Sequence, residues 1–168
     1  MADSSVRDWI GPPAVSLAAV LGVNLVVQAL GLQGGASGPP GWLIGTVWTV
    51  IFALYGLAYA ALRRVPEPAG SRKAGPGPDG AGPSGSGPDG AGQVGPRKAG
   101  IVGLGIICLA YPFYTSGFED AGVALAGTAA TFVAAAALVV WLWPVSRAAA
   151  LLVAPVLPWL IYAATILV

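Results

Sequence analysis

Five long stretches of the chain are apolar and almost free of charge, and polar or Gly- and Pro-rich segments separate them. An α-helix needs about 20 apolar residues to cross the hydrocarbon core of a bilayer. The pattern therefore predicts an all-α integral membrane protein, a bundle of five transmembrane helices that forms a single domain over residues 1–168. We expect the helices at about residues 12–32, 42–64, 100–117, 121–143 and 148–168.

The first span follows Pro12 and Pro13, which fit a helix start because the first helical position needs no backbone N–H. A secretory signal peptide is the alternative, since small residues follow at 34–37. The span is too long for a signal sequence, and no net positive charge precedes it, so we expect a retained helix. Asn24 and Gln28 share one face, where we expect hydrogen bonds to a neighbouring helix or, as the rarer alternative, contact with a ligand.

The second span follows a Pro-Pro-Gly turn and has the most distinctive pattern. Its aromatic residues recur at helical spacing and share one face: Trp48, Phe52, Tyr55 and Tyr59. Its small residues leave a neighbouring face open to close packing: Gly45, Thr49 and Gly56. Trp42 and Tyr59 lie near the ends of the span and fit the aromatic belt at a membrane interface. Trp48 and Phe52 lie too deep to meet lipid headgroups, so we expect them to face protein or a ligand.

Residues 65–99 have a different composition, dominated by Gly, Pro, Ala and Ser. The hexapeptide at 77–82 is repeated at 87–92, and the tetrapeptide at 72–75 recurs at 97–100. Such a segment cannot bury a core, so we expect a disordered loop between the second and third helices. We interpret it as a flexible tether, with a regulatory or partner-docking role as the alternative.

The last three spans are joined by short connectors at 118–120 and 144–147, so consecutive helices must lie antiparallel. Gly100, Gly103 and Gly105 resemble a nucleotide-binding motif, but no strand precedes them. Together with the alanines at 134–137 they favour close helix packing, either within the bundle or in a homodimer. Three further aromatic residues are assigned to the interfacial belt: Tyr111, Trp141 and Trp143.

The amino-acid composition excludes several kinds of functional site. The chain is 56% hydrophobic and 9% charged, with a net charge of +1, and it has no basic face that would bind nucleic acid. It contains no histidine, one cysteine (Cys108) and one methionine (Met1). The usual metal ligands and the commonest general base are therefore missing, and we expect neither a metal site nor a catalytic residue. A haem iron would find only Tyr or Cys108 as ligands.

The positive charges indicate an orientation in the membrane. If the long loop is cytoplasmic, all eight Lys and Arg residues fall on the cytoplasmic side, as the positive-inside rule requires. We therefore expect the N-terminus and the 65–99 loop in the cytoplasm and the C-terminus outside. The abundance of Ala, Gly and Pro suggests a bacterium with a GC-rich genome, which would place the protein in the plasma membrane.

Three segments resemble the TspO/MBR family, the tryptophan-rich sensory proteins related to the mitochondrial translocator protein (peripheral benzodiazepine receptor). The run Pro39-Pro40-Gly41-Trp42-Leu43-Ile44-Gly45-Thr46-Val47-Trp48 resembles the family's second-helix pattern, Pro-Pro-x-Trp-x-x-Gly-Pro-Val-Trp. The run Pro155-Val156-Leu157-Pro158-Trp159-Leu160-Ile161-Tyr162-Ala163 is similar to its last-helix pattern, and Cys108-Leu109-Ala110-Tyr111-Pro112 to its third-helix region. The chain departs from the family pattern at four positions: Ser37, Thr46, Cys108 and Leu167.

The resemblance implies a five-helix bundle, often dimeric, that binds porphyrins, sterols or drug-like hydrophobic molecules in a pocket capped by the first loop. It implies these ligand-binding residues: Trp42, Trp48, Phe52, Trp159, Tyr162 and Ala163. We thus expect a membrane sensory or binding protein for porphyrin-type tetrapyrroles or other hydrophobic ligands, with a transport or stress-regulatory role. No cofactor is required, and porphyrin or haem is a ligand in this interpretation.

Two other functions compete with binding. One is a membrane enzyme that modifies porphyrin, and the other is a small transporter of hydrophobic solutes. Both would normally use ionisable groups inside the membrane, but Glu119 and Asp120 fall in a turn. We therefore expect no enzyme. The expected partners are a hydrophobic small molecule, the lipid bilayer and a second copy of the chain.

Overall fold

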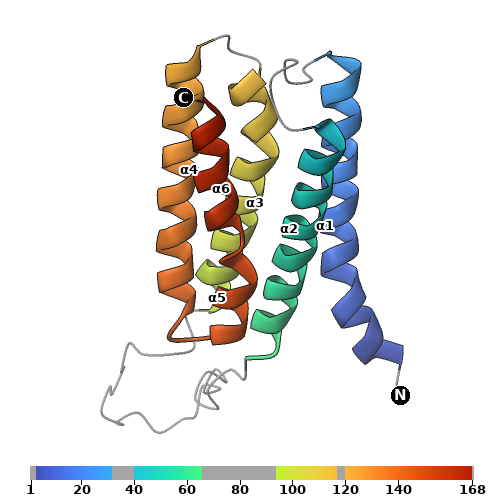
Figure 1. The fold of residues 1–168 in the computed structure, drawn as a ribbon. Coiled ribbons are helices and arrows are strands. Elements are labelled where there is room, and N and C mark those ends of the chain that lie inside the picture. Colours follow the sequence, from blue (N-terminus) through green and yellow to red (C-terminus); the bar gives the residue numbers. More distant parts are fainter. Residues whose placement is uncertain (1–2, 32–39, 66–93, 117–119, 168) are drawn as a thin grey trace, which may run out of the picture.

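The computed structural model describes residues 3–31, 40–65, 94–116 and 120–167 (Figure 1). Within these ranges the chain forms α-helices and no β-strand. The helices are α1 (Asp3–Ala29), α2 (Gly41–Arg63), α3 (Val94–Ser116), α4 (Ala121–Leu142), α5 (Arg147–Val153) and α6 (Val156–Leu167). The last two follow each other in one span, so that five spans are long and apolar enough to cross a membrane. The predicted five-helix, all-α membrane protein is confirmed.

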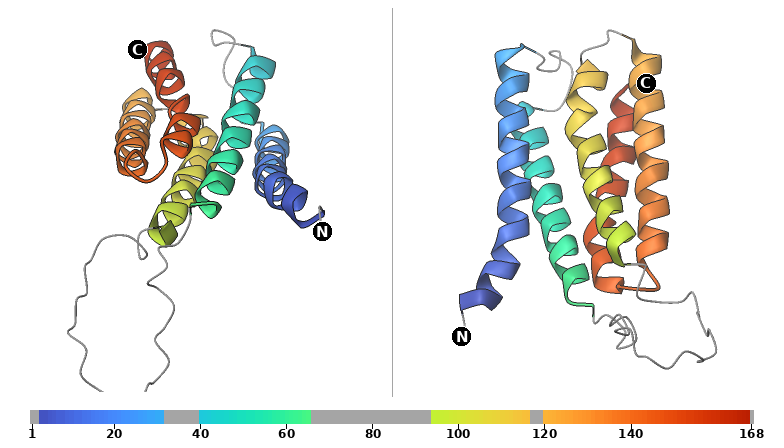
Figure 2. Two further views of the ribbon diagram at one scale, coloured as in Figure 1. Left: turned by 90° about the horizontal axis from the view of Figure 1, so that it is seen from below. Right: turned by 180° about the vertical axis from the view of Figure 1, so that it is seen from behind.

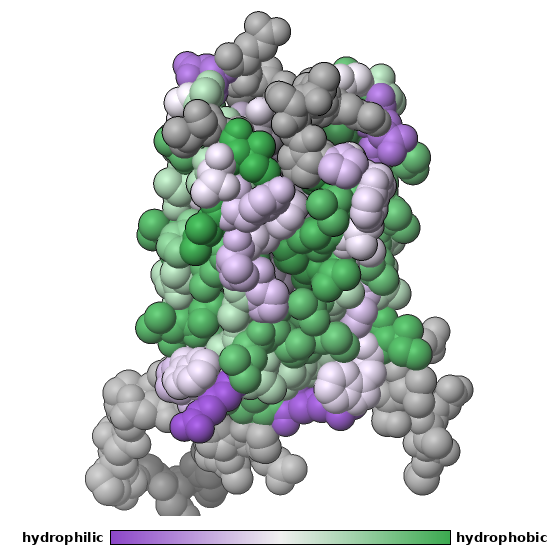
Figure 3. All heavy atoms as spheres, viewed as in Figure 1, coloured by the Kyte–Doolittle hydropathy of each residue, from purple (hydrophilic) through white to green (hydrophobic). Residues whose placement is uncertain are grey.

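Consecutive spans run in opposite directions (Figure 1). Helix α1 packs on α2, α2 packs on α3 and α5, and α4 packs on α3 and α6 (Figure 2). In the face drawn in Figure 3 the strongly hydrophilic residues lie near the two ends, and the middle is mostly hydrophobic with a stripe of weakly hydrophilic residues. This is the surface that a bilayer requires, because lipid meets the middle of each span and water meets its ends.

One end of the bundle carries the cations of the described helices. We call it the basic end, defined by Arg7, Arg63, Arg64, Arg97, Lys98 and Arg147. Asp120 lies at the opposite end, where its carboxylate caps α4 by accepting hydrogen bonds from the backbone N–H groups of Gly122 (2.7 Å) and Val123 (3.4 Å). The predicted gathering of positive charge on one side therefore holds for the described residues.

The first helix begins at Asp3, not at residue 12, and continues through Pro12 and Pro13. The prolines remove only two backbone hydrogen bonds, and their fixed φ is compatible with a helix. Packing against α2 supports this segment, because Gly56 lies against the backbone of Pro12 and Pro13 so closely that a Cβ on Gly56 would overlap it. The close-packing role predicted for Gly56 is thus confirmed, and the prediction that Pro12 starts the helix is wrong.

Asn24 and Gln28 were predicted to form hydrogen bonds to a neighbouring helix, and this prediction is wrong. Asn24 is partly buried and Gln28 is exposed, and neither side chain forms a hydrogen bond within the part of the chain that the structure describes. Their face of α1 turns partly away from the other helices, which explains the missing partners.

The third helix begins at Val94, inside the segment predicted to be a loop. Pro96 lies in its first turn, where backbone N–H groups have no partner within the helix, so a proline costs little. Val94 and Arg97 are both buried, so the first turn is held by tertiary contacts that composition alone did not reveal. Residues 66–93 of the predicted loop, and the 32–39 loop, lie outside the described residues.

The last span breaks at Pro155, where a single helix over 148–168 was predicted. Pro155 and Pro158 have no N–H to donate to the carbonyls one turn earlier, so the helical hydrogen bonds are interrupted there. The Leu157 N–H bonds instead to the Ala154 carbonyl, three residues back, at 3.0 Å. The two halves pack differently, because α5 contacts both α2 and α4, whereas α6 packs mainly on α4 (Figure 1).

Candidate functional site

The aromatic face predicted for α2 forms the centre of the bundle. Trp48, Phe52 and Tyr55 are each at most 5% exposed. Their rings follow one another along the helix, with centroids 6.2 Å apart from Trp48 to Phe52 and 5.7 Å apart from Phe52 to Tyr55. Trp48 and Phe52 therefore face protein in this structure, one of the two environments that the sequence predicted.

Tyr111 of α3 completes this aromatic cluster. Its ring centroid lies 5.3 Å from that of Trp48, and its hydroxyl lies 3.2 Å from the Thr128 hydroxyl of α4. The assignment of Tyr111 to an interfacial belt is therefore wrong. The missed signal was the helical spacing of the buried stripe on α3: Ile101, Leu104, Cys108 and Tyr111.

Side-chain hydroxyls hold α3 against its neighbours. Tyr114 follows Tyr111 one turn later on α3, and its hydroxyl lies 2.9 Å from that of Thr131 in α4. On the other side of α3 the Cys108 sulfur lies 3.7 Å from the Tyr55 hydroxyl of α2. Polar atoms inside a membrane protein need such partners because no water replaces them. These contacts fix the aromatic cluster between three helices.

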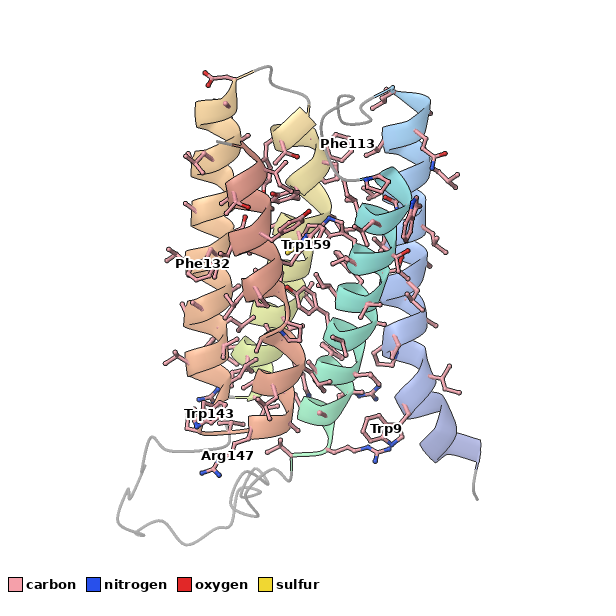
Figure 4. All side chains as sticks on the ribbon, viewed as in Figure 1. Trp9, Phe113, Phe132, Trp143, Arg147 and Trp159 are labelled. Carbon is pink, nitrogen blue, oxygen red and sulfur yellow. The ribbon has the colours of Figure 1, made fainter. Side chains whose placement is uncertain are left out.

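The second predicted group lies on α6. The rings of Trp159 and Tyr162 have centroids 5.5 Å apart. Trp159 and Ala163 are half-buried against the core, whereas Tyr162 is 44% exposed. Figure 4 shows Trp159 projecting from α6 on the side toward α2.

The indole nitrogen of Trp159 has an unusual environment. Nε1 is fully buried and has no hydrogen-bond partner, and it is the one such side-chain atom among the described residues. A buried N–H without a partner costs roughly 1–3 kcal/mol of stability. The indole therefore offers an unused donor in the interior of the bundle.

The structure does not join the predicted site residues into one cluster. Trp48 and Phe52 form no ring contact with Trp159 or Tyr162, although all four are described. The reason is the break at Pro155, after which α6 follows α4 rather than α2 (Figure 1). Trp42 is 72% exposed at the start of α2. This exposure fits the interfacial belt, which was the alternative to a ligand-binding role.

A groove of about 670 Å³ lies along the contact between α4 and α6, and none of the predicted site residues lines it. Its lining includes Phe132 and Leu160, and its two threonines, Thr128 and Thr165, already donate to backbone carbonyls. Within the described ranges no group of three or more His, Cys, Asp or Glu residues could hold a metal ion. The site that the structure offers is therefore aromatic and apolar, with one free indole donor.

Comparison with known families agrees with this architecture. The model of the TspO/MBR family matches residues 29–168, which take in all of α2 to α6. No curated protein matches the chain.

Proposed function

This chain belongs to the TspO/MBR family, and on that premise we propose that it is a membrane sensory and binding protein for porphyrin-type tetrapyrroles or other hydrophobic ligands. The proposed output is transport or stress regulation rather than catalysis. The ligand-binding residues are those implied by the family resemblance, Trp48, Phe52, Trp159, Tyr162 and Ala163, with Trp42 at the entrance.

The unpartnered Nε1–H of Trp159 is the observation that supports this proposal best. A ligand with a hydrogen-bond acceptor beside an apolar surface would satisfy the donor and cover the indole. A tetrapyrrole has both features, since its macrocycle is flat and largely apolar and its ring nitrogens and carboxylates accept hydrogen bonds. Flat rings also stack well on aromatic side chains, with about 0.5–1.5 kcal/mol per pair beyond burial.

We place the ligand between α2 and α6. The wall on the α2 side is Trp48 and Phe52, supported from behind by Tyr111, and the wall on the α6 side is Trp159 and Tyr162. Ala163 leaves room because its side chain is small. Because Trp48 and Phe52 are buried, the ligand enters from the side of the half-exposed Tyr162 and separates α6 from α2.

The ligand is held by shape and stacking, and no cofactor takes part. Neither an enzyme that modifies porphyrin nor a transporter driven by protons is favoured, because the described acidic residues, Asp3, Asp8 and Asp120, lie at helix ends. In the proposed orientation the basic end faces the cytoplasm of a bacterium and the C-terminus lies outside. The homodimer implied by the family resemblance stays a prediction.

Quenching of intrinsic tryptophan fluorescence by protoporphyrin IX tests the proposal in purified, detergent-solubilised protein. The chain has six tryptophans, all of which contribute to the fluorescence. The affinity of the wild type is therefore compared with the affinities of single tryptophan variants. We expect saturable quenching at about one ligand per chain. Trp159→Phe keeps an aromatic ring but removes the N–H, and it should lower the affinity about tenfold, the effect of about 1.4 kcal/mol. Trp48→Phe should also weaken binding.

Trp143→Phe is the matched control. Trp143 is 47% exposed at the basic end, away from the proposed pocket (Figure 4). Its replacement should leave the affinity unchanged. Quenching that does not saturate, and that is equally insensitive to all three substitutions, would mean that porphyrin merely partitions into detergent, and the proposed binding function would then be wrong.

A further inference from the structure

Helix α1 lies at one side of the bundle, beyond α2 (Figure 2). It packs on α2 and has only a smaller contact with α3. Among the α1 side chains that the structure describes, those from residue 9 onward, Val20 alone is buried. The segment Trp9–Ala29 is nevertheless long and apolar enough to cross a membrane. Most of its surface therefore faces either lipid or another protein.

One edge of α1 carries residues at alternating spacings of three and four. We call it the amide edge, defined by Ala14, Leu17, Leu21, Asn24 and Gln28. Because successive residues of an α-helix turn by about 100°, this spacing holds all five in one stripe, beside the face that packs on α2. Leu21 is 57% exposed, Ala14 and Gln28 are also exposed, and Leu17 and Asn24 are partly buried. The amide edge is thus open to a partner helix.

The two amides on this edge have no hydrogen-bond partner within the described part of the chain. Gln28 lies at the end of the span, where water and headgroups can reach it. Asn24 lies one turn deeper, roughly 7 Å from the end of the helix at a rise of about 1.5 Å per residue. Its side chain is too short to reach water from that depth, and lipid tails offer no hydrogen bond. A protein partner is therefore favoured over lipid.

We propose that the amide edge of α1 binds the amide edge of a second copy of the chain. An amide group is both donor and acceptor, so this edge is complementary to itself. A two-fold axis along the membrane normal places Asn24 at the same depth as the partner's Asn24, as a contact between identical surfaces requires. Side chains of Asn and Gln form hydrogen bonds of this kind between membrane helices.

Packing and charge are compatible with this contact. The alternating spacing is that of two helices packed side by side at a small crossing angle, with Leu17 and Leu21 as the apolar contacts. No charged residue occurs between Trp9 and Ala29, so two copies bring no like charges together within the membrane. The amide edge precedes the residues that match the family model, so the family resemblance does not assign this interface.

Sedimentation equilibrium of the full chain in density-matched detergent tests the proposal. We expect a reversible equilibrium between monomer and dimer. Asn24→Leu removes an amide that forms no hydrogen bond in the described fold. It should raise the dissociation constant of the dimer about tenfold. Asn24→Gln keeps an amide and should keep most of the affinity, and Gln28→Leu should have the smaller effect because water competes at the end of the span.

Leu21→Ala and Val26→Ala form a matched pair. Both remove an exposed apolar side chain from α1, since Leu21 and Val26 are 57% and 47% exposed. Val26 lies about 140° round the helix from Leu21 and so is not on the amide edge. Leu21→Ala should weaken the dimer, and Val26→Ala should leave it unchanged. Thr46→Val is the control for loss of a polar group, because Thr46 is exposed on α2 and donates only to the Trp42 carbonyl of its own helix.

A wild type that stays monomeric at every concentration would overturn the proposal. A dimer insensitive to both Asn24→Leu and Leu21→Ala would overturn it as well, and its dissociation by Gly103→Leu would place the interface on α3 instead. Circular dichroism checks that each variant keeps its helices. The measurement needs no ligand, so its result does not depend on the proposed binding function. Porphyrin affinity should be unchanged in Asn24→Leu, because α1 contributes no residue to the proposed pocket.

Discussion

The Tyr111 ring packs against that of Trp48 in a tilted arrangement, with a ring-centroid distance of 5.3 Å and an angle of 49° between the ring planes. The same side chain reaches Thr128 with its hydroxyl, so that one residue of α3 contacts both α2 and α4. The orientation of the Trp48 ring consequently depends on a hydrogen bond that Tyr111 forms to a third helix, α4. If Trp48 lines the ligand pocket as proposed, Tyr111 is a positioning residue for it.

Tyr111→Phe tests this link because it removes only the hydroxyl. Thr128 keeps its own bond to the Ala124 carbonyl (2.8 Å) and is not left without a partner. We therefore expect a modest loss of stability, about 0.6–1.7 kcal/mol, the range for hydrogen bonds between membrane helices. The loss can be measured by SDS titration in mixed micelles. Tyr111→Ala should in addition lower porphyrin affinity, and unchanged affinity there would contradict the positioning role.

Gly56→Ala should destabilise the contact of α1 with α2. The added methyl group would overlap the backbone of Pro12 and Pro13, which cannot move aside like a side chain. We expect a loss of about 1–3 kcal/mol in the free energy of unfolding. Gly45→Ala is the control on the same helix, since a Cβ there meets nothing within 4 Å. It should be neutral or gain up to about 1 kcal/mol from helix propensity.

Arg97→Gln should lower stability through the end of α4. Arg97 is 3% exposed, and its Nε satisfies the Trp141 carbonyl in the last turn of that helix, where a cation is also favourable for the helix dipole. Loss of this charged hydrogen bond should cost about 1.5–3 kcal/mol. Arg147→Gln is the control, because Arg147 is exposed at the same end of the bundle. Thermal unfolding in detergent should show that this substitution leaves the stability nearly unchanged.

Cys108 should resist thiol reagents as long as the bundle is folded. Its side chain is 2% exposed and its sulfur lies against the Tyr55 hydroxyl. Maleimide labelling should therefore be slow in mild detergent and fast after SDS unfolds the helices. A cysteine introduced at position 147, an exposed position at the basic end, in a Cys108→Ala background, should react at once under both conditions. Rapid labelling of Cys108 in the folded protein would mean that α3 and α2 separate readily.

The order of the spans and the aromatic face of α2 could be derived from the sequence because they are local properties. The length and apolar character of a segment decide whether it can cross a bilayer, and the spacing of Trp48, Phe52 and Tyr55 decides that they share a face. The position at which a helix begins or ends depends less on local sequence. Val94 and Arg97 belong to α3 because neighbouring helices bury them, although the composition around them is typical of a loop.

Tertiary structure alone decided which faces meet. The spacing of Ile101, Leu104, Cys108 and Tyr111 puts these residues on one face of α3, but that this face meets α2 and α4 follows only from the rotation of α3 in the bundle. Likewise Pro155 and Pro158 mark a weak point in the last span, but the direction that α6 takes depends on its packing against α4. Sequence determines where helices can form and which side chains share a face. Their crossing and rotation are set by the sum of contacts between distant segments, and these decide that Trp48 is enclosed while the Trp159 indole keeps an unused donor.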